Sequence, residues 1–376
     1  MSAAPRGIGS RLTGAALNGV LLSASLAATA LMLEGGLRLF TGARYLDVDL
    51  RLRGEGIAYA PGQIQRWKRI EWDVLYSINS KGFRDREYAP PTPEGSLLVV
   101  GDSFTEGYGI DFEKCYVKLL EKDLREERPE LRVYNGGLSG RGIPEYRRVY
   151  EEAFASDPGI GAVVMGLDVS SDILPADRTG PEPAAPSAVP VRHRFFYPFK
   201  RFFSEHSVLY NFVRRPAKIS PELRYLLERV GLMTDYAATT QLPFWDGGDR
   251  TRWEATTREL LKFAAAVNAS GRGFAVLLIA HKSQIEDDFF DYQMRLWKMN
   301  VSREERFGFN RYLVDFCARN GIPVLDMTGP MREENARNPK SLFFRTDGHW
   351  NPAGHAFVAA RLAEFVAESR LLKNSI

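Results

Sequence analysis

Short apolar runs alternate with helical patterns along the chain after about residue 95, and this alternation constrains the fold more than any other feature. Five of the runs predict buried strands: 97–100, 131–134, 162–165, 274–279 and 322–325. Four stretches with helical spacing or helix-boundary residues predict helices: 111–127, 144–156, 304–320 and 352–371. Repeated strand–helix–strand order predicts a parallel sheet with helices on its faces.

Breaks in this alternation predict the domain organisation. Residues 45–94 are mixed and turn-rich, with Pro61-Gly62 and a proline-rich stretch at 90–93 as chain breaks. We interpret them as a lead-in segment that packs on the main domain, which covers 95–376. The alternation stops again at about 175–248, so we interpret that stretch as an insertion into the main domain.

The insertion contains an aromatic and basic segment, FFYPFKRFF at residues 195–203. One interpretation is a patch that contacts a membrane surface or stacks on a glycan. The other is a set of aromatic side chains that pack on the main domain. We favour the second interpretation, because soluble proteins seldom expose clusters of this kind.

The N-terminal segment, residues 1–44, is predicted to be a signal-anchor. An uncharged stretch at 12–33 lies between Arg11 and Glu34, and as a helix it reaches roughly 33 Å, enough for a hydrocarbon core of about 30 Å. The arginines before it predict a cytoplasmic N-terminus and a main domain in the periplasm or on the cell surface. A cleaved signal peptide ending at Ala28-Thr29-Ala30, and hence a secreted protein, is an alternative, and a buried core helix is another.

Composition excludes several classes of function. A formal net charge of +3 over 376 residues gives no reason to expect nucleic-acid binding. The two cysteines, Cys115 and Cys317, are too few for a disulfide scaffold and lie in no metal-ligand spacing. They fall on predicted helices that cover opposite faces of a sheet ordered 2-1-3-4-5, so we expect two free thiols. We expect no cofactor and no metal.

A candidate nucleophile follows the first predicted strand, in the sequence Gly-Asp-Ser-Phe-Thr-Glu-Gly at 101–107. The carboxyl ends of parallel strands form the ligand-binding edge of such a sheet. Ser103 is predicted at the N-terminus of the following helix, where backbone N–H groups favour a developing negative charge. The alternative is an ordinary turn with a helix cap, which suits aspartate and serine equally well.

A candidate base lies near the C-terminus, in the sequence Asp-Gly-His-Trp-Asn at 347–351. A serine hydroxyl needs a neutral imidazole to accept its proton, and the imidazole needs an acidic partner that holds its tautomer. Asp347 and His349 lie on one loop before a helix, which allows both side chains to act together. The alternative is Asp347 as a helix cap and His349 as a half-buried loop residue, and we expect His355 on the helix to be a packing residue.

Together these motifs resemble the SGNH/GDSL hydrolase superfamily. The match includes Ser103 in its block, the Asn-Gly-Gly-Leu-Ser-Gly block at 135–140 after the second strand, and the block at 347–351. Residues 79–85 resemble the lead-in of membrane-tethered members, and Asp-x-His-Trp at 347–350 also resembles the alginate-acetylation branch. The resemblance implies a flavodoxin-like three-layer α/β/α sandwich with a five-stranded parallel sheet, preceded here by a transmembrane helix.

The resemblance also implies roles for individual residues. Ser103 would be the nucleophile, His349 the general base and Asp347 its orienting partner. The N–H groups of Ser103 and Gly140 would form part of the oxyanion hole. Asp102 would be a structural residue of the nucleophile turn.

One block departs from the superfamily pattern. The third block normally supplies an asparagine whose amide donates to the oxyanion, but residues 166–173 contain none. Aligning Asp172 with the superfamily's aspartate places Ser171 at the asparagine position, where a hydroxyl donates one hydrogen bond with a shorter reach. Losing a donor of this kind costs about 2.7–4 kcal/mol in another hydrolase. Two further residues lie near the predicted edge of the sheet. We expect Arg141 to be a solvated loop residue, and His281 to line the wall of the site or to have a structural role.

The predicted function is ester hydrolysis through an acyl-enzyme on Ser103, outside the cytoplasm, with an acylated glycan, a lipid or a small ester as substrate. An O-acetyltransferase of the same fold that modifies an exported polysaccharide, with a membrane acyl-transfer protein as partner, is the first alternative. A catalytically silent scaffold is the second.

Overall fold

The structure is a computed structural model, and it describes residues 8–41, 52–53, 57–68, 71–88, 91–174, 199, 202–203, 206–219, 250–297, 299–345 and 347–372. The chain forms two compact units. One comprises Met1–Val48, Lys68–Ile70 and Pro190–Ile219, and the other comprises Asp49–Trp67, Glu71–Val189 and Ser220–Ile376.

A five-stranded parallel sheet forms the centre of the larger unit, with the strand order β6-β5-β7-β8-β9. This order confirms the predicted arrangement 2-1-3-4-5. The strands are β5 (Ser96–Gly101), β6 (Val133–Gly137), β7 (Ile160–Asp168), β8 (Gly273–Ile279) and β9 (Val324–Asp326).

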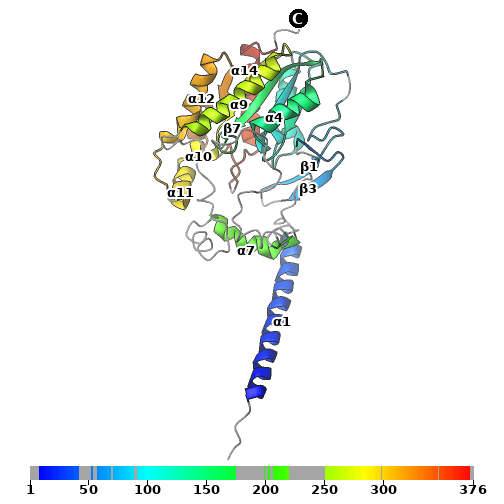
Figure 1. Cartoon of the computed structure of the whole chain (residues 1–376), viewed down its shortest axis with the longest axis vertical. Helices are drawn as coiled ribbons and strands as arrows, with labels where there is room; N and C mark the ends of the chain where they lie inside the picture. The colour runs from blue at the N-terminus through cyan, green and yellow to red at the C-terminus, as the bar shows by residue number, and fades with distance from the viewer. Residues whose placement is uncertain are drawn as a thin grey trace, which may run out of the picture. The chain divides into compact units, whose positions relative to one another are not determined.

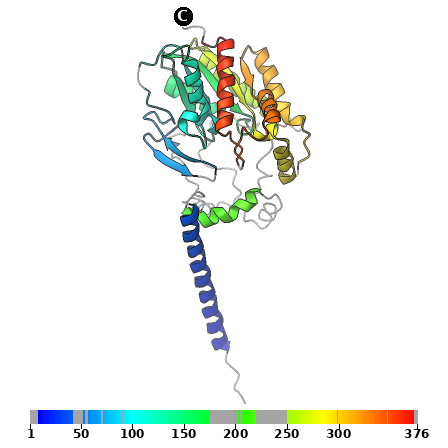
Figure 2. The same ribbon diagram turned by 180° about the vertical axis from the view of Figure 1, so that it is seen from behind.

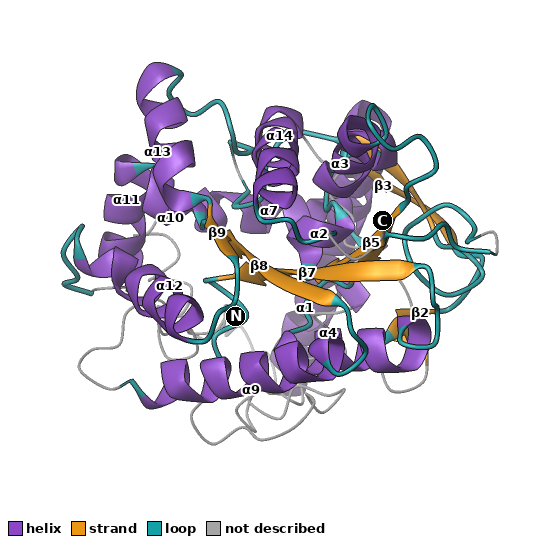
Figure 3. Ribbon diagram, turned by 90° about the horizontal axis from the view of Figure 1, so that it is seen from above, coloured by secondary structure: helices purple, strands orange, loops and turns teal. Residues whose placement is uncertain are grey.

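Helices cover both faces of this sheet, which confirms the three-layer α/β/α fold (Figure 3). Alternate side chains of β5 point to opposite faces, so Leu98 and Val100 join one core and Leu97 and Val99 join the other. The first face packs on α4 (Ile143–Val149), α9 (Thr251–Asn268) and α12 (Gly308–Arg319). The second packs on α3 (Tyr116–Leu124) and α14 (Pro352–Glu368).

Several element boundaries differ from those predicted. The predicted helix at 144–156 divides into α4 and a π-helical turn at Tyr150–Phe154. Three helices of the larger unit that follow β8 were not predicted: α10 (Lys282–Ile285), α11 (Asp287–Trp297) and α13 (Thr328–Arg337). A short helix α2 (Ser103–Glu106) follows β5 and carries the candidate nucleophile.

The lead-in segment forms two small two-stranded sheets. The first is an antiparallel pair of β1 (Leu52–Arg53) with β2 (Ala58–Tyr59), and the second pairs β3 (Ile64–Lys68) with β4 (Asp73–Ser77). Tyr59, Tyr76 and Phe83 are buried in the same core as the first face of the main sheet. Asp85 also makes a buried ion pair with Lys118 of α3, with 2.9 Å between Oδ1 and Nζ. The larger unit therefore uses these residues as part of its interior.

The two cysteines are buried and free, as expected from the predicted topology. Cys317 lies in the core of the first face and Cys115 in the core of the second.

The smaller unit contains the N-terminal helix α1 (Ile8–Thr41) and the helix α7 (Val208–Ile219), which meets the C-terminal end of α1 (Figures 1 and 2). The span Leu17–Thr41 is long and apolar enough to cross a membrane, and its apolar side chains are exposed. The described part of the aromatic segment, at 199 and 202–203, belongs to this unit. Phe199 and Phe202 are exposed. The interpretation that these aromatics pack on the main domain stays a prediction.

Candidate active site

The nucleophile turn follows directly from the end of β5. Asp102 caps α2, because its Oδ1 accepts a hydrogen bond from the backbone N–H of Phe104 at 2.9 Å. Gly101 is needed at this turn, since a Cβ there would lie 2.2 Å from Oγ1 of Thr105. The turn therefore presents Ser103 as the first residue of a helix at the carboxyl edge of the sheet.

The structure brings the three predicted triad residues together. Oγ of Ser103 lies 2.7 Å from Nε2 of His349, and Nδ1 of His349 lies 2.5 Å from Oδ1 of Asp347. The same carboxylate oxygen accepts the backbone N–H of His349 at 2.9 Å. The Ser103–His349 distance is within the range of a nucleophile–base hydrogen bond, and the His349–Asp347 contact is a short hydrogen bond between the imidazole and its carboxylate partner.

Backbone and side-chain contacts hold the loop that carries the base. Phe343 and Trp350 form an antiparallel bridge, and the N–H of Phe344 donates to the carbonyl of His349 at 3.0 Å. The buried ammonium of Lys282 donates to the carbonyl of Phe344 at 2.6 Å and to that of Arg345 at 3.2 Å. Lys282 was not singled out from the sequence, although it follows β8 at the edge where site residues gather.

Two aromatic rings flank the imidazole of His349. The ring centroid of Phe104 lies 4.8 Å from that of the imidazole, and the ring centroid of Tyr108 lies 4.6 Å from it. Tyr108 in turn contacts Trp67 and Trp72 of the lead-in segment. The lead-in segment therefore contributes to the packing of the base, which the sequence pattern did not predict.

The charges in the triad shift its two pKa values in opposite directions. Burial lowers the pKa of His349, but the hydrogen bond and the charge of Asp347 outweigh it, so the pKa lies above the ordinary 6.5. Burial raises the pKa of Asp347, but its hydrogen bonds with His349 and the imidazole charge bring it below the ordinary 3.8. Asp347 therefore stays ionised and stabilises a protonated imidazole.

The loop of the second block, within residues 135–140, is hydrogen-bonded to the nucleophile turn. The N–H of Leu138 donates to the carbonyl of Gly101 at 2.9 Å, and that of Ser139 donates to Oε2 of Glu106 at 2.8 Å. Gly140 follows with a φ of 69° in the left-handed region. No atom lies within 4 Å of the position that its Cβ would occupy, so the space beside it is open. Its role as an oxyanion donor stays a prediction.

Ser171 donates toward carboxylates in this structure. Its Oγ lies 3.0 Å from Oδ2 of Asp168, 3.2 Å from Oδ2 of Asp102 and 3.3 Å from Oδ1 of Asp172. The three carboxylates are buried. Burial and the charge of Asp168 raise the pKa of Asp102 to about 7, and burial and the charge of Asp102 raise the pKa of Asp172. The assignment of Ser171 to the oxyanion hole stays a prediction, and these contacts favour a structural role.

Three other residues singled out from the sequence have defined places. His281 lies at the carboxyl end of β8, where Nδ1 is 2.7 Å from Oγ of Ser283 and burial lowers the pKa of the imidazole. His355 is buried on α14 and its Nδ1 accepts the backbone N–H of Tyr116, which confirms a packing role. Arg141 is half-buried rather than a fully solvated loop residue, and its Nε is buried with no hydrogen-bond partner.

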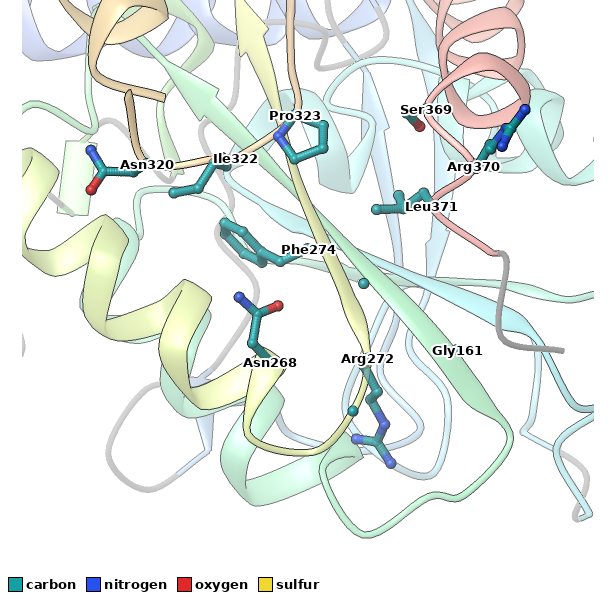
Figure 4. Close-up of a pocket in the computed structure, with 13 residues that line it drawn as sticks. Gly161, Asn268, Arg272, Phe274, Asn320, Ile322, Pro323, Ser369, Arg370 and Leu371 are labelled. Carbon is teal, nitrogen blue, oxygen red and sulfur yellow. The ribbon is translucent and has the colours of Figure 1, made fainter. Parts of the chain in front are cut away.

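Within the described residues, no group of three or more His, Cys, Asp or Glu side chains is arranged to hold a metal ion. Figure 4 shows a cavity of about 320 Å³. Ser103 follows the carboxyl end of β5, and the cavity lies at the other edge of the sheet. Gly161, Gly273 and Pro323, at the amino ends of β7, β8 and β9, are among its lining residues. This cavity is therefore separate from the triad.

The parallel sheet with helices on both faces, and the grouping of Ser103, His349 and Asp347 at its carboxyl edge, resemble the arrangement expected for an SGNH hydrolase-like α/β domain. Residues 245–375 match the family model described as the SGNH hydrolase-like domain of the acetyltransferase AlgX. The match includes Asp347 and His349 and begins after Ser103. These findings confirm the resemblance to the SGNH/GDSL superfamily and to its alginate-acetylation branch.

Among curated proteins, AlgJ of Pseudomonas aeruginosa, described as a probable alginate O-acetylase, is 37% identical to this chain over 82 residues. The match spans 21% of this chain and 20% of AlgJ. The aligned part is therefore a minor fraction of both proteins.

Similar solved structures include proteins described as esterases and as members of the G-D-S-L family. The acetyl xylan esterase AlAXEase is 13% identical, with 72% of this chain and 99% of that chain covered and a TM-score of 0.40. The acetyl-xylooligosaccharide esterase Axe2 from Geobacillus Stearmophilus is 14% identical, with 73% and 95% covered and a TM-score of 0.40. A lipolytic G-D-S-L family protein from Veillonella parvula is 13% identical, with 72% and 96% covered and a TM-score of 0.37.

Proposed function

We propose that this protein cleaves carboxylic esters through an acyl-enzyme on Ser103. The observation that carries the proposal is the continuous hydrogen-bonded series from Oγ of Ser103 through the imidazole of His349 to the carboxylate of Asp347. We propose acetylated glycans as the substrate class, because the name of the matched relative AlgJ refers to the acetylation of a polysaccharide. Lipid esters and small esters are the other substrates that we consider.

In the proposed reaction, Oγ of Ser103 attacks the ester carbonyl carbon while Nε2 of His349 accepts the hydroxyl proton. The tetrahedral intermediate collapses, the C–O bond to the alcohol breaks, and His349 returns the proton to the leaving alkoxide. Water then attacks the acyl-enzyme with His349 again as the base, which releases the acid and restores the serine hydroxyl. Asp347 stays ionised and holds the imidazole in the required tautomer.

The carbonyl oxygen becomes negative in this reaction and needs donors. We propose the N–H groups of Ser103 and Gly140 for this role. The first lies at the start of α2, and the second lies on the loop that Leu138 and Ser139 fasten beside the nucleophile turn. The open space beside Gly140 leaves room for an oxyanion near its backbone.

Turnover of p-nitrophenyl acetate by the full-length chain tests this proposal. Ser103→Ala should abolish enzyme-dependent release of p-nitrophenol, while Ser139→Ala, which also removes a nearby serine hydroxyl, should retain most of it. Equal turnover by wild type and Ser103→Ala would refute the proposed nucleophile. No turnover of any short ester by well-folded wild type would instead favour a catalytically silent scaffold.

A second candidate function is O-acetyl transfer to an exported polysaccharide. The matches to the AlgX domain and to AlgJ favour it, since both are named for acetyl transfer. The chemistry differs only in the last step, where a sugar hydroxyl replaces water as the nucleophile that attacks the acyl-enzyme. A membrane acyl-transfer protein would then be the proposed partner that delivers the acetyl group.

Adding a polysaccharide acceptor to the acetyl-ester assay distinguishes the two functions. Transfer predicts that acetyl groups appear on the polysaccharide, as mass spectrometry can detect, at the expense of free acetate. Hydrolysis predicts acetate alone at every acceptor concentration. Ser103→Ala removes both products under either function.

We propose that α1 anchors the protein in the membrane and that the larger unit is outside the cytoplasm. The exposed apolar span Leu17–Thr41 supports this location. A cysteine substituted for the exposed Leu75, tested in spheroplasts with a membrane-impermeant maleimide, should react without lysis. Reaction only after lysis would place the larger unit in the cytoplasm, and recovery of a shortened soluble protein would instead indicate signal cleavage.

A further inference from the structure

We infer that the segment from Phe199 to Val213 is a membrane-surface element that contacts anionic lipid and is attached to the anchor helix through Glu34. The inference rests on the membrane anchor proposed above and extends it to a second contact with the bilayer. All of the described residues that carry it belong to the smaller unit.

Glu34 of α1 caps the N-terminus of α7. Its carboxylate accepts hydrogen bonds from Oγ of Ser207 at 2.8 Å and from the N–H groups of Val208 at 2.9 Å and Leu209 at 2.8 Å. The N–H groups of Val208 and Leu209 are the first of α7 and have no partner within the helix itself. A carboxylate at this position also has a favourable interaction with the helix dipole. The two helices are therefore joined by specific hydrogen bonds at one point.

Arg38 strengthens the same junction. Its Nε lies 2.7 Å from Oε1 of Glu34, one helical turn earlier on α1, and its Nη2 donates to the carbonyl of His206 at 2.5 Å. The junction therefore contains one carboxylate, one guanidinium and the backbone at the start of α7. It fixes where α7 begins along the length of α1.

The position of Glu34 along α1 places this junction at the membrane surface. The uncharged stretch between Arg11 and Glu34 has roughly the length of a hydrocarbon core when helical, about 33 Å. If that stretch spans the core, Glu34 and Arg38 emerge at the level of the lipid headgroups. The start of α7 then lies at the same level, because it is hydrogen-bonded to Glu34.

The surface around this junction is apolar and aromatic. Phe199 is 67% exposed, Phe202 56%, Phe212 44% and Val213 63%, and at the end of α1 Phe40 is 92% exposed. Exposed aromatic rings are common where a protein meets the interface between water and lipid. Soluble proteins rarely expose a cluster of apolar and aromatic side chains, because contact of such a cluster with water is unfavourable.

The sequence of this segment and of the rest of α7, up to Ile219, is basic. Between residues 199 and 219 it carries five basic residues and one acidic residue: Lys200, Arg201, Glu205, Arg214, Arg215 and Lys218. Basic residues near an anionic membrane surface increase the attraction of a protein to it. Apolar contact and positive charge together are typical of helices that lie in the membrane interface. This favours an anionic phospholipid surface over an uncharged glycan as the partner.

Fluorescence quenching in vesicles tests the inference on the full-length chain. Cysteine replaces Phe202, Phe212, Leu26 or Leu75 in separate variants and is labelled with an environment-sensitive NBD dye. The native Cys115 and Cys317 are fully buried and do not compete for the label in the folded protein. Each variant is reconstituted in phosphatidylglycerol–phosphatidylcholine vesicles with and without bromine on the acyl chains.

The inference predicts blue-shifted emission and bromine-dependent loss of emission at positions 202 and 212. Position 26 in α1 reports on the anchor itself, and position 75 in the larger unit should show neither effect. Quenching at position 26 without quenching at 202 and 212 would overturn the inference while leaving the anchor intact. Loss of quenching at all three positions would refute the anchor and the inference together, and neither result bears on ester turnover.

Two further variants test the attachment through Glu34. Glu34→Ala should reduce quenching at positions 202 and 212 and leave it unchanged at position 26, whereas Glu34→Gln, which keeps an acceptor, should retain more of it. Equal quenching at 202 and 212 in wild type and Glu34→Ala would refute attachment through this carboxylate. A response of the dyes to added polysaccharide, without any response to brominated lipid, would overturn the lipid assignment.

Discussion

The hydroxyl of Ser171 lies 3.2 Å from Oδ2 of Asp102, the residue that immediately precedes the candidate nucleophile. The same hydroxyl contacts the carboxylates of Asp168 and Asp172. A single hydroxyl proton in a buried group of three carboxylates serves to reduce their repulsion, and one proton donates to one acceptor at a time. We therefore expect the position that supplies an oxyanion donor in the superfamily to help hold the nucleophile turn to the end of β7 in this chain.

Ser171→Ala tests this role. We expect it to lower the free energy of unfolding by about 1–3 kcal/mol, since it removes the partner of buried carboxylates. We expect kcat for acetyl-ester hydrolysis to fall much less than the roughly 10²–10³-fold that follows loss of an oxyanion donor. Thermal unfolding and steady-state kinetics measure the two effects. A kcat loss of that size with unchanged stability would instead identify Ser171 as an oxyanion donor.

The pH dependence of the reaction follows from His349. Because the reaction needs a neutral imidazole and the pKa of His349 lies above 6.5, kcat/KM should rise with pH through that raised pKa. Asp347→Asn removes the charge that raises it, so the acid limb should move to lower pH. The maximum should also fall, by about 10⁴-fold if the loss resembles that of the equivalent change in serine proteases. An unchanged acid limb in Asp347→Asn would argue against the assigned pair.

The same pair contributes to stability with a defined sign. The folded pKa of His349 is raised above the unfolded value, so the stabilisation by the protonated imidazole is fully present below about pH 6.5. It is lost as the pH rises through the folded pKa. Asp347 has a lowered folded pKa, so its contribution is present above about pH 3.8 and is lost as the pH falls through the folded value.

Chemical unfolding at pH 5.5 and pH 8.5 would measure this contribution to stability. The difference in stability between wild type and His349→Gln should be larger at the lower pH. A difference that is the same at both pH values would mean that the imidazole does not titrate in the folded protein within this range.

Lys282 is expected to position the base rather than to contact the substrate. Its ammonium donates to the carbonyls of Phe344 and Arg345, just before the loop that carries Asp347 and His349. Lys282→Met should reduce kcat by up to about 10²-fold, as a small misplacement of a catalytic group does, with little change in KM. Lys282→Arg, which keeps donors, should recover part of the loss. If KM changed as much as kcat in both variants, Lys282 would instead contact the substrate.

Arg84 connects the lead-in segment to the nucleophile turn. Its guanidinium is buried and donates to the carbonyls of Glu106 at 3.1 Å, Gly107 at 2.5 Å and Ile110 at 2.6 Å. Arg84→Met removes a charged donor from all three carbonyls, although that of Gly107 keeps the N–H of Ile110 at 3.1 Å, and it should lower the free energy of unfolding by about 1–3 kcal/mol. Arg66→Met is the matched control, because it removes an exposed arginine of the same segment and should change the melting temperature little. Equal melting temperatures of Arg84→Met and wild type would contradict this role.

The central sheet could be predicted from the sequence because its strands are apolar and locally continuous. The strand order followed from the resemblance to a flavodoxin-like fold, and the structure confirms it. The second strand begins later than predicted, at Val133, because the N–H of Leu131 donates to the carbonyl of Arg128 in a turn. Helix α9 was missed although Trp253, Leu260, Phe263 and Val267 have helical spacing, because it borders the insertion.

The parts of the site that were not predicted depend on contacts between distant segments. Tyr108 and Lys282 act on the loop of His349 only because folding brings together residues from three regions of the chain. Local pattern identified Ser103, Asp347 and His349 because each lies in a recognisable block. It assigned Ser171 by alignment alone, and the carboxylates around its hydroxyl became apparent only in three dimensions.

The central claim is that Ser103 is an activated nucleophile, and covalent labelling tests it most directly. The full-length chain is incubated with a fluorophosphonate, and the modified residue is located by mass spectrometry of its peptides. The account predicts stoichiometric labelling of Ser103, no labelling of Ser103→Ala, and much slower labelling of His349→Gln, which lacks the general base. Labelling of another residue, or none in folded wild type, would contradict it.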